Sequence, residues 1–464
     1  MRGPVHVIGG GLAGCECAYQ LARRGVPVVL HEMRPERSTP AHKTDGFAEL
    51  VCSNSLRSDD PTHAAGLLKR EMERFDSVII GSARDASVPA GSALAVDREI
   101  FSRRVGERLQ ALPELEIRRR EVLEIPDGDV VIATGPLTSP AMAERLAELL
   151  GSEYLYFYDA IAPIVEGESL DHSKLFWASR YDKGGADYLN VPLDKEGYLA
   201  FYDALVNAEV LPLHDFEKAL FFEGCMPIEE LARRGVDTLR FGPMKPVGLR
   251  GPDGRRPWAV IQLRRESLST QHFNLVGFQS RMKWGEQKRV FGLLPGFENA
   301  EFLRFGQIHR NTFISSPRHL DVHYRLRARP TVRLAGQITG VEGYLESAAT
   351  GLAVGLYLAL ERQGQALEPF PATTALGALA RHLTESDPDH FQPANIHYGL
   401  FHPPPERGNR GERRSFLSER AHRELERWAE ATGLPIAPAP AEEHAEPRSG
   451  SSRLAPEQPA PATT

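Results

Sequence analysis

The sequence predicts an α/β protein in which a nucleotide-binding domain is interrupted by an inserted α+β domain. Three observations predict this arrangement. Residues 5–32 read as a strand, a glycine turn, a helix and a second strand that ends in an acid. An apolar strand at 129–133 and another at 332–336 each run into glycine, and the second precedes a small-residue helix. Between them, residues 161–300 consist of short strand-like runs broken by Gly and Pro.

The first turn carries the glycine spacing that holds a dinucleotide, Gly9-x-Gly11-x-x-Gly14. Gly9 permits the tight turn, Gly11 lets the backbone approach a pyrophosphate, and Gly14 lets the helix pack close to the sheet. The amides that open the helix favour negative charge, and Glu32 is placed to accept hydrogen bonds from an adenosine ribose. The expected cofactor contacts of this segment are Gly9, Gly10, Gly11, Leu12, Ala13, Gly14 and Glu32.

Two later segments extend the cofactor site. The strand ending in Thr134 and Gly135 is typical of flavoproteins, near the first nucleotide fold, because small residues let the backbone approach the cofactor. A strand, a glycine turn at Gly336-Gln337 and a helix that opens at Tyr344 lie where glutathione-reductase-like flavoproteins place the flavin ring. We therefore expect a glutathione-reductase-like Rossmann domain that binds FAD and is discontinuous in sequence. Tyr344 either stacks on a heterocycle or packs in the core.

The expected organisation has four parts: a first nucleotide-binding part at 1–160, an insertion at 161–300, a second nucleotide-binding part at 301–434, and a tail at 435–464. Helices are expected at about 64–75, 97–112 and 415–432 from their apolar spacing, at 14–24 between the first glycine turn and Gly25, and at 344–360 from a run of small residues. The tail is rich in Pro and Ala and has no aromatic residue, so it cannot bury enough surface to offset its chain entropy. We expect it to be disordered.

Composition narrows the setting. The chain has 464 residues, of which 41% are hydrophobic and 25% charged, as in ordinary globular proteins. Four cysteines without a C-x-x-C pair are too few for a disulfide framework and lack zinc spacing, and the sixteen histidines show no ligand pattern. We expect a cytoplasmic protein with no metal, no membrane segment and no signal peptide.

The net charge of −7 conceals a strong segregation of charge. Residues 240–333 carry 18 Lys and Arg against 6 Asp and Glu, whereas the rest of the chain is acidic. This pattern indicates either a positive surface for a polyanion or a set of solvated ion pairs. Basic residues stand beside an aromatic at Arg281, Lys283 and Trp284, an association that suits unpaired RNA bases and phosphates.

Two isolated cysteines are the best candidates for a nucleophile. Cys52 stands among polar residues in a loop, and Cys225 stands in a turn between Gly and Pro. A loop thiol with cationic or helix-terminal neighbours can carry a useful fraction of thiolate, although a buried structural thiol is the commoner fate of cysteine. Cys15 and Cys17 lie on the first helix, where packing against the sheet explains them better. His309 and Arg310 either bind substrate or shape a turn.

Several segments together resemble one family. They are residues 9–14, VCSNSLRSDD at 51–60, FEGCMPIEELARRG at 222–235, FGPMKPVGL at 241–249, KWGEQKRVF at 283–291, PGFENAEFLRFGQIHRNTFISSP at 295–317 and LAGQITGVEGYLESAATGL at 334–352. Their order and content closely resemble the folate- and flavin-dependent tRNA uracil-5-methyltransferase family. The resemblance extends to about residue 434 and leaves out only the tail.

The resemblance implies a methylation of tRNA. In that reaction 5,10-methylenetetrahydrofolate donates a one-carbon unit to C5 of the uridine at position 54 in the T-loop. Reduced FAD supplies electrons, and NADPH or NADH reduces the flavin again. A thiolate must add to C6 because uracil C5 is otherwise a poor nucleophile. The matching cysteines are Cys225, assigned as the attacker, and Cys52, assigned to assist it or to shield the flavin. No stable protein partner is implied.

Two features depart from the wider flavoprotein pattern. Many relatives carry Gly-Asp where this chain has Gly336-Gln337, so the ribityl contact is expected at Gln337 or at backbone. No second G-x-G-x-x-G is present for the nicotinamide.

Three alternatives remain open. They are a wobble-uridine carboxymethylaminomethyl flavoprotein, which shares the 335–344 pattern, a flavin-bearing RNA-binding factor, and a flavin oxidoreductase for a small metabolite. The segments at 51–60 and 222–235 favour the methyltransferase over the first, and the basic segment argues against the last.

Overall fold

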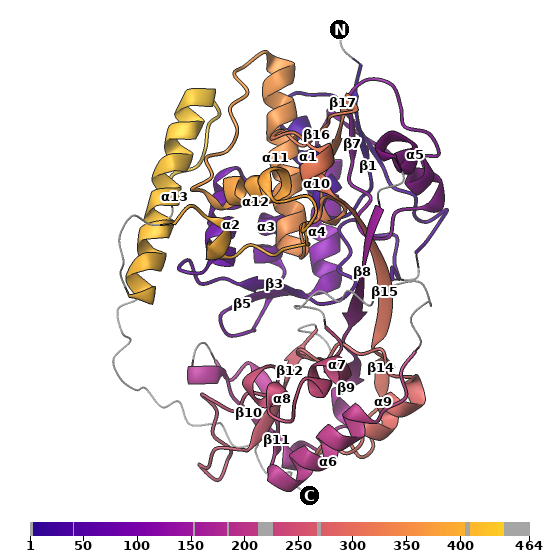
Figure 1. Ribbon diagram of the computed structural model, residues 1–464, viewed down its shortest axis with the longest axis vertical. Coiled ribbons are helices and arrows are strands. Elements are labelled where there is room, and N and C mark those ends of the chain that lie inside the picture. The colour runs from indigo at the N-terminus through magenta and orange to yellow at the C-terminus, as the bar shows by residue number, and fades with distance from the viewer. Residues whose placement is uncertain are drawn as a thin grey trace, which may run out of the picture.

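The computed structural model describes residues 3–39, 41–151, 154–182, 185–211, 226–266, 271–403 and 409–439. For 154–161, 182, 307–312 and 410 it describes the backbone only. The nucleotide-binding part and the insertion form two bodies, one above the other in Figure 1, joined by a long two-stranded ribbon.

The nucleotide-binding part is built on a six-stranded sheet. In spatial order its strands are β16 (Arg325–Leu326), β17 (Arg329–Leu334), β7 (Val130–Ile132), β1 (Val5–Ile8), β2 (Val28–His31) and β6 (Leu115–Arg118). All pairs are parallel except the edge pair of β16 with β17. Because β17 follows the insertion yet pairs with β7, the sheet is made from two distant parts of the chain.

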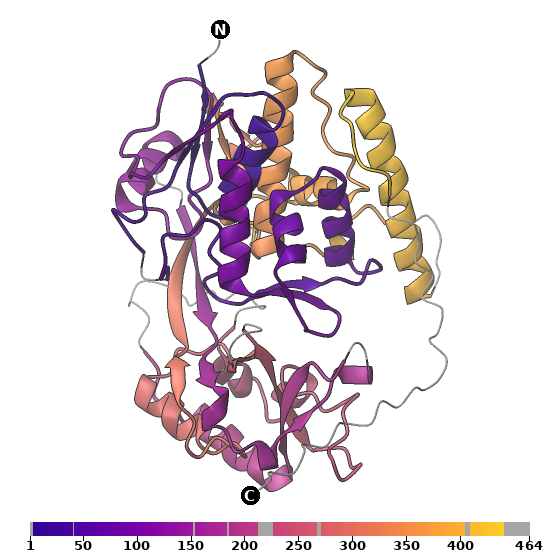
Figure 2. The ribbon, with the colours of Figure 1, turned by 180° about the vertical axis from the view of Figure 1, so that it is seen from behind.

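The nucleotide-binding part also contains helices, which pack on the sheet and on one another. They are α1 (Leu12–Ala22), α2 (Ala64–Arg74), α3 (Val78–Asp85), α4 (Arg98–Gln110), α5 (Pro140–Leu150), α10 (Ser316–His319), α11 (Tyr344–Gln363), α12 (Ala375–Glu385) and α13 (Arg410–Thr432). The five helices expected from the sequence are confirmed as α1, α2, α4, α11 and α13, with ends that differ by a few residues. Figure 2 shows α2, α3 and α4 from the side opposite to Figure 1.

Close packing of α1 on α11 joins the two parts of the sheet domain. A methyl group at Gly351 would lie 2.1 Å from the carbonyl oxygen of Ala13, and one at Gly355 would lie 3.0 Å from that of Cys17. The glycines on α11 therefore let the two backbones approach where larger side chains would separate them. This contact brings the helix that begins at Tyr344 against the helix that follows the first glycine turn.

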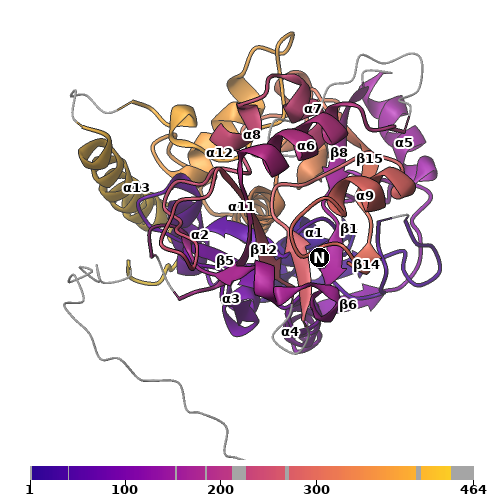
Figure 3. The same cartoon turned by 90° about the horizontal axis from the view of Figure 1, so that it is seen from below.

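The insertion has its own six-stranded sheet. Its order is β10 (Phe176–Trp177), β11 (Tyr188–Leu193), β12 (Ala259–Arg265), β13 (His272–Leu275), β9 (Ile164–Glu166) and β14 (Phe302–Arg304). Helices α6 (Lys195–Val206), α7 (Ile228–Arg233), α8 (Thr238–Phe241) and α9 (Trp284–Phe291) belong to the same body. Seen from below in Figure 3, α6 and α9 lie well apart from α13.

The two bodies are joined by strands β8 (Tyr154–Ile161) and β15 (Gln307–Ile314), which pair antiparallel. A small sheet of β3 (Ser55–Ser58), β5 (Ala93–Val96) and β4 (Ser87–Val88) lies on the side of the nucleotide-binding part that faces the insertion (Figure 1). From these sheets we propose that the insertion extends from β9 to β14.

Three further expectations can be compared with the structure. The tail from residue 440 onward lies outside the described residues, so its predicted disorder stays a prediction. Within the described part of the chain, no helix combines the length and apolarity needed to cross a membrane. Cys15 and Cys17 are fully buried on α1, as expected for thiols that pack against the sheet.

Candidate active site

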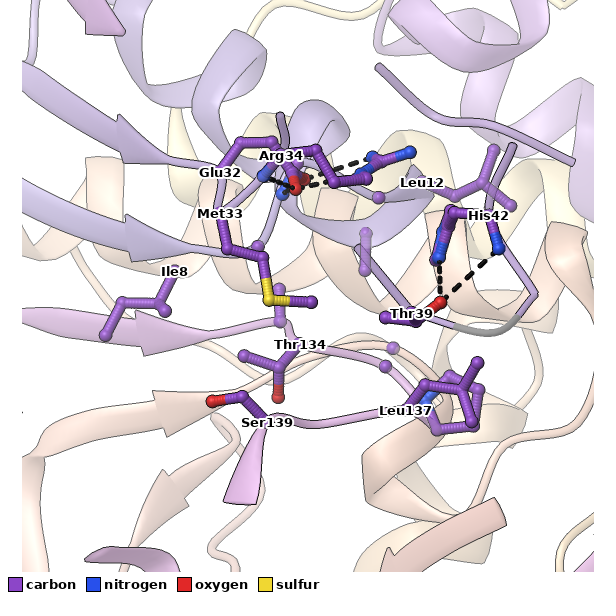
Figure 4. A pocket seen from close by; sticks show the side chains of 18 of the residues that line it. Ile8, Leu12, Glu32, Met33, Arg34, Thr39, His42, Thr134, Leu137 and Ser139 are labelled. Atoms are coloured by element: carbon purple, nitrogen blue, oxygen red, sulfur yellow. Dashed lines mark hydrogen bonds and ion pairs between the residues drawn. The ribbon is translucent and has the colours of Figure 1, made fainter. Parts of the chain in front are cut away.

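A pocket opens at the carboxyl ends of β1, β2 and β7 (Figure 4). It holds about 1070 Å³ of space, its open mouth included. The residues predicted to contact the cofactor line it together, with the exception of Gly14: Gly9, Gly10, Gly11, Leu12, Ala13, Glu32, Thr134, Gly135, Gly336, Gln337 and Tyr344. Residues more than 300 positions apart in the sequence therefore meet in one site.

The glycines of the first turn differ in what they allow. Gly9 has a φ of +110°, and a methyl group there would lie 2.5 Å from the carbonyl oxygen of Ala133. A methyl group at Gly14 would lie 1.8 Å from the carbonyl oxygen of Gly9, so this glycine serves packing and not the pocket wall. Gly11 and Gly135 have nothing within 4 Å of the methyl position, although both line the pocket. That open space fits a ligand against bare backbone.

The start of α1 supplies unpaired donors to the same space. Its N-cap, Gly11, offers no side-chain hydrogen bond, and the first turn contains no acid. The first amides of a helix need partners from outside it, and they favour an anion. A diphosphate at Gly11, Leu12 and Ala13 would satisfy both requirements.

Glu32 is more occupied than the sequence predicts. Its carboxylate accepts the Gly10 amide at 2.9 Å, the Arg34 amide at 3.0 Å and the Arg34 guanidinium at 2.9 and 3.1 Å (Figure 4). Burial alone would raise the pKa of Glu32, but the hydrogen bonds and charge of Arg34 outweigh it and hold the pKa below its usual value. All four acceptor positions are filled, so a ribose hydroxyl could bond here only by replacing one of these donors.

The second glycine turn is held at the opposite wall. Gly336 has a φ of +85° and donates its amide to the Thr350 hydroxyl of α11 at 2.7 Å. Gln337 donates one side-chain N–H to Glu342 at 2.7 Å, which leaves its carbonyl oxygen and its second N–H to face a ligand. The predicted contact at Gln337 or backbone remains a proposal.

The Cys52 loop meets the pocket at Tyr344. The Tyr344 hydroxyl oxygen lies 2.6 Å from the Cys52 amide nitrogen, 3.2 Å from the Ser53 amide nitrogen and 2.8 Å from Cys52 Sγ. Burial raises the pKa of Tyr344 well above its usual value, and the neighbouring Cys52 raises that pKa further. The phenol therefore stays protonated.

The two amide donors at the Tyr344 oxygen determine the direction of the hydrogen bond between this oxygen and Cys52 Sγ. A phenol oxygen has two lone pairs and one proton. The two amides can only donate and take the lone pairs, so the proton points to Cys52 Sγ. A hydrogen bond donated to sulfur favours the thiolate, and this arrangement makes Cys52 a proton acceptor.

Arginines from both bodies donate hydrogen bonds to the Cys52 loop, residues 50–54. Arg304 of β14 donates to the carbonyl oxygens of Val51 and Cys52 at 3.0 and 3.1 Å. Arg264 of β12 donates to Ser53 Oγ at 2.9 Å and Asn54 Oδ1 at 2.8 Å. Arg264 is buried and Arg304 is half-buried, and guanidinium groups keep their charge in proteins. Their positive charge also favours a thiolate at Cys52.

The nucleotide-binding part adds a third guanidinium to the loop. Arg98, at the start of α4, donates to the carbonyl oxygen of Leu50 at 2.9 Å and forms an ion pair with Glu266 of the insertion at 2.8 Å. Asn54 in turn donates to the carbonyl oxygens of Val96 and Arg265, one from each body. The sequence singled out none of these arginines, because each lies tens to hundreds of residues from Cys52.

The other predicted residues are placed less fully. Cys225 lies outside the described residues. His309 and Arg310 have their backbones in β15, paired with Asp159 and Tyr158, and their side chains are outside the description.

The predicted RNA-binding cluster is partly engaged with acids. Arg281 pairs with Glu230, and Lys283 pairs with Glu209 at 2.6 Å. Trp284 is 58% exposed and stacks on Phe305 with ring centres 5.6 Å apart. The basic segment at 240–333 is thus a mixture of ion pairs, buried arginines and exposed cations. The described residues contain no cluster of His, Cys, Asp and Glu suited to a metal.

A split parallel sheet, two glycine turns and one pocket between them define a dinucleotide-binding protein of the two-part type. The family model described as "Glucose inhibited division protein A" matches residues 4–366. Curated relatives share more than half of their residues with this chain. The methylenetetrahydrofolate–tRNA-(uracil-5-)-methyltransferase TrmFO of Paramagnetospirillum magneticum is 55% identical over 92% of this chain and 99% of its own length. Proteins of the same name from Listeria monocytogenes and Geobacter sulfurreducens are 54% and 55% identical, over 93% and 92% of this chain and 100% and 99% of their own lengths.

The chain therefore belongs to the glucose inhibited division protein A family and, within it, to the TrmFO methyltransferases. Solved structures agree on the fold. Two crystal forms of Aquifex aeolicus GidA match with TM-scores of 0.67 and 0.66 at 16% and 15% identity. The matches cover 93% and 94% of this chain and 74% and 78% of the GidA chains. The expected fold class is confirmed.

Proposed function

We propose that this chain methylates C5 of uridine 54 in the T-loop of tRNA. The one-carbon donor is 5,10-methylenetetrahydrofolate, and the reductant is FAD that NADPH or NADH reduces. The observation that carries the proposal is the Cys52 thiol, hydrogen-bonded to the Tyr344 hydroxyl at the end of a pocket that suits a dinucleotide. Family membership supports the reaction and the folate donor.

The residues present fit FAD. The start of α1 and the open space over Gly11 and Gly135 suit the diphosphate and the backbone approach it needs. Gly336, Gln337 and Tyr344 are left to hold the flavin end. Bound there, FAD would supply the electrons that turn a methylene group into a methyl group.

The protein's own chemistry begins with the two cysteines. A thiolate adds to C6 of the uracil, which makes C5 nucleophilic through an enolate. Once C5 carries the new carbon, its proton must leave and the carbon–sulfur bond must break. We assign Cys225 as the attacker. Cys52, held as a hydrogen-bond acceptor by Tyr344, has the geometry of a proton acceptor.

One assay tests the reaction. Purified protein is incubated with unmodified tRNA, labelled methylenetetrahydrofolate and NADPH, and label is expected in 5-methyluridine in the T-loop. Label from S-adenosylmethionine, or none, would overturn the proposal. Label in the wobble uridine would instead support the carboxymethylaminomethyl alternative.

The cysteine roles need a trapping experiment. Cys225→Ala should abolish the covalent enzyme–RNA adduct, while Cys52→Ala should retain the adduct and lose methyl transfer. Cys17→Ala is the control, since this thiol is fully buried on α1. An adduct that survives Cys225→Ala contradicts the assignment. Tight tRNA binding without methyl transfer, unchanged when both cysteines are replaced, favours the RNA-binding factor.

We also propose that the reaction takes place in the cytoplasm, where a thiolate mechanism is protected from oxidation.

A further inference from the structure

A second pocket lies in the insertion, away from the Cys52 loop. It is formed by the start of α6, the end of β11, the turn at 251–256 and Trp258. Four cations line it: Lys195, Arg240, Arg255 and Arg256. Asp194 and Asp253 also line it, but they accept the amides of Gly197 and Arg255 and so stabilise the local backbone. The pocket has a net positive charge.

The ring of Trp258 organises these cations. The Arg240 guanidinium lies 3.8 Å from the ring centre and donates to the Trp258 carbonyl oxygen at 3.1 Å. The Lys195 ammonium lies 5.5 Å from the same ring. Lys195 is also the first residue of α6, a helix of 12 residues, so the positive end of the helix dipole adds to its charge.

Three of the cations are available to a ligand. Lys195, Arg255 and Arg256 are exposed, and none of them forms an ion pair with a described carboxylate. Arg240, in contrast, is paired with Asp237 at 2.7 Å. Arg264 and Arg304 of the insertion are already engaged in hydrogen bonds with the Cys52 loop. The three exposed cations of the pocket, in contrast, take no part in the proposed mechanism.

The pocket and the Cys52 loop lie at opposite ends of strand β12. Strand β12 begins beside Trp258 and ends at Arg264 and Arg265, which contact the Cys52 loop. Side chains two apart on a strand share a face, so Trp258 and Arg264 lie on the same face of the inserted sheet, about 20 Å apart. The opposite face, with Ala259, Ile261 and Leu263, forms the core of the insertion.

The paired strand confirms this geometry. On β11, Tyr188 is opposite Arg264, and its hydroxyl reaches the Ala90 carbonyl oxygen of the nucleotide-binding part at 2.9 Å. Pro192, four residues along on the same face, lines the second pocket. One face of the sheet therefore leads from the catalytic loop to the basic pocket.

We propose that this pocket binds the sugar–phosphate backbone of the substrate RNA outside the methylated loop, as a second anchor about 20 Å from the Cys52 loop. The inference rests on the proposed function. Exposed Lys and Arg side chains that bind phosphates supply affinity without reading sequence. We expect the full tRNA to reach both sites, and the isolated T-arm hairpin, which lacks the rest of the tRNA, to bind at the Cys52 loop alone.

The test compares two triple variants with the same change in charge. Lys195→Ala/Arg255→Ala/Arg256→Ala removes the pocket cations. Arg103→Ala/Arg413→Ala/Arg423→Ala removes three exposed cations from α4 and α13. The affinity for an unmodified tRNA transcript is measured against salt concentration, alongside kcat and KM for the transcript and for the T-arm hairpin.

The pocket variant should lower the slope of log affinity against log salt by about 3 for the full transcript, since each of the three removed cations contributes about 1. KM for the transcript should rise about tenfold, while kcat and all constants for the hairpin stay unchanged. Equal slopes for the two variants would overturn the proposal, and so would equal weakening of transcript and hairpin. Methyl transfer to the hairpin by the unaltered protein tests the proposed function separately, because the pocket is not needed for it.

Discussion

Replacing Tyr344 with Phe removes one oxygen atom. The Cys52 loop should keep its position, while the reactivity of the Cys52 thiol should fall. The hydroxyl is the acceptor for the Cys52 and Ser53 amides and the donor to Cys52 Sγ. Phe retains the ring and its packing at the start of α11. The loop stays in place because Arg98, Arg264 and Arg304 still bind it.

The magnitudes differ for stability and for rate. Two partly buried amides lose their acceptor, which costs about 1–3 kcal/mol of unfolding free energy. The hydrogen bond to sulfur involves a charged acceptor, and such bonds contribute about 1.5–3 kcal/mol. If the thiolate of Cys52 takes part in the rate-limiting step, kcat should fall by about 10- to 100-fold.

The assay pairs methyl transfer with alkylation of Cys52 by iodoacetamide at fixed pH, and both rates should fall. Tyr357→Phe is the matched control. Tyr357 lies on the same helix and its hydroxyl accepts the Phe370 amide at 2.8 Å, so this variant loses a buried acceptor far from the thiol. Equal kinetics in the two variants, with equal losses of stability, would refute a role for the Tyr344 hydroxyl in activating Cys52.

Two further predictions concern the pocket. Gly14→Ala should lower both the stability of the protein and its FAD content, because the added methyl group would lie 1.8 Å from the Gly9 carbonyl oxygen. Gly11→Ala should lower the affinity for FAD and leave the stability of the cofactor-free protein unchanged, because its methyl group would enter open space. Flavin absorbance measures the FAD content, and thermal melts measure the stability. Glu32→Gln should destabilise the protein by about 3 kcal/mol near pH 7, because it leaves the buried Arg34 charge with only one acid partner. The pKa of Glu32 is lowered in the folded state, so its contribution is full above the unfolded value and is lost as pH falls through the folded one. The difference between Glu32→Gln and the unaltered protein in urea titrations should therefore shrink below about pH 4; a constant difference would contradict the ion-pair account.

Local patterns predicted the nucleotide-binding elements because their causes are local. The glycine spacing that needs a tight turn also fixes where α1 begins, and the structure has that helix at Leu12–Ala22 against an expected 14–24. The split of the domain was predictable for the same reason, since the segment around Gly336 repeats the strand and turn that a cofactor needs.

The surroundings of the predicted residues were not accessible in this way. Glu32 was expected to accept hydrogen bonds from a ribose, yet Arg34, only two residues later, fills three of its four acceptor positions and the Gly10 amide fills the fourth. A count of charges could not distinguish arginines that point inward, such as Arg264 and Arg304, from those on the surface. Both are held by a loop more than 200 residues earlier in the chain, and neither spacing nor composition carries such a contact.

Arg264 and Arg304 show that the basic segment at 240–333 has a second role, which is to hold the Cys52 loop. Cys52 lies in the first part of the nucleotide-binding domain, but two of the three arginines described on its loop, Arg264 and Arg304, come from the insertion. The thiol is therefore positioned only when both bodies are folded and in contact. The basic segment at 240–333 serves two needs at once: guanidinium groups that contact the loop fix its thiol in a form that favours the thiolate, and exposed ones remain for a polyanionic substrate. This explains why the positive charge is concentrated in the segment that follows β11 and is not spread over the chain, and why removing charge from Arg264 or Arg304 should affect chemistry while removing it from Arg255 or Arg256 should affect binding.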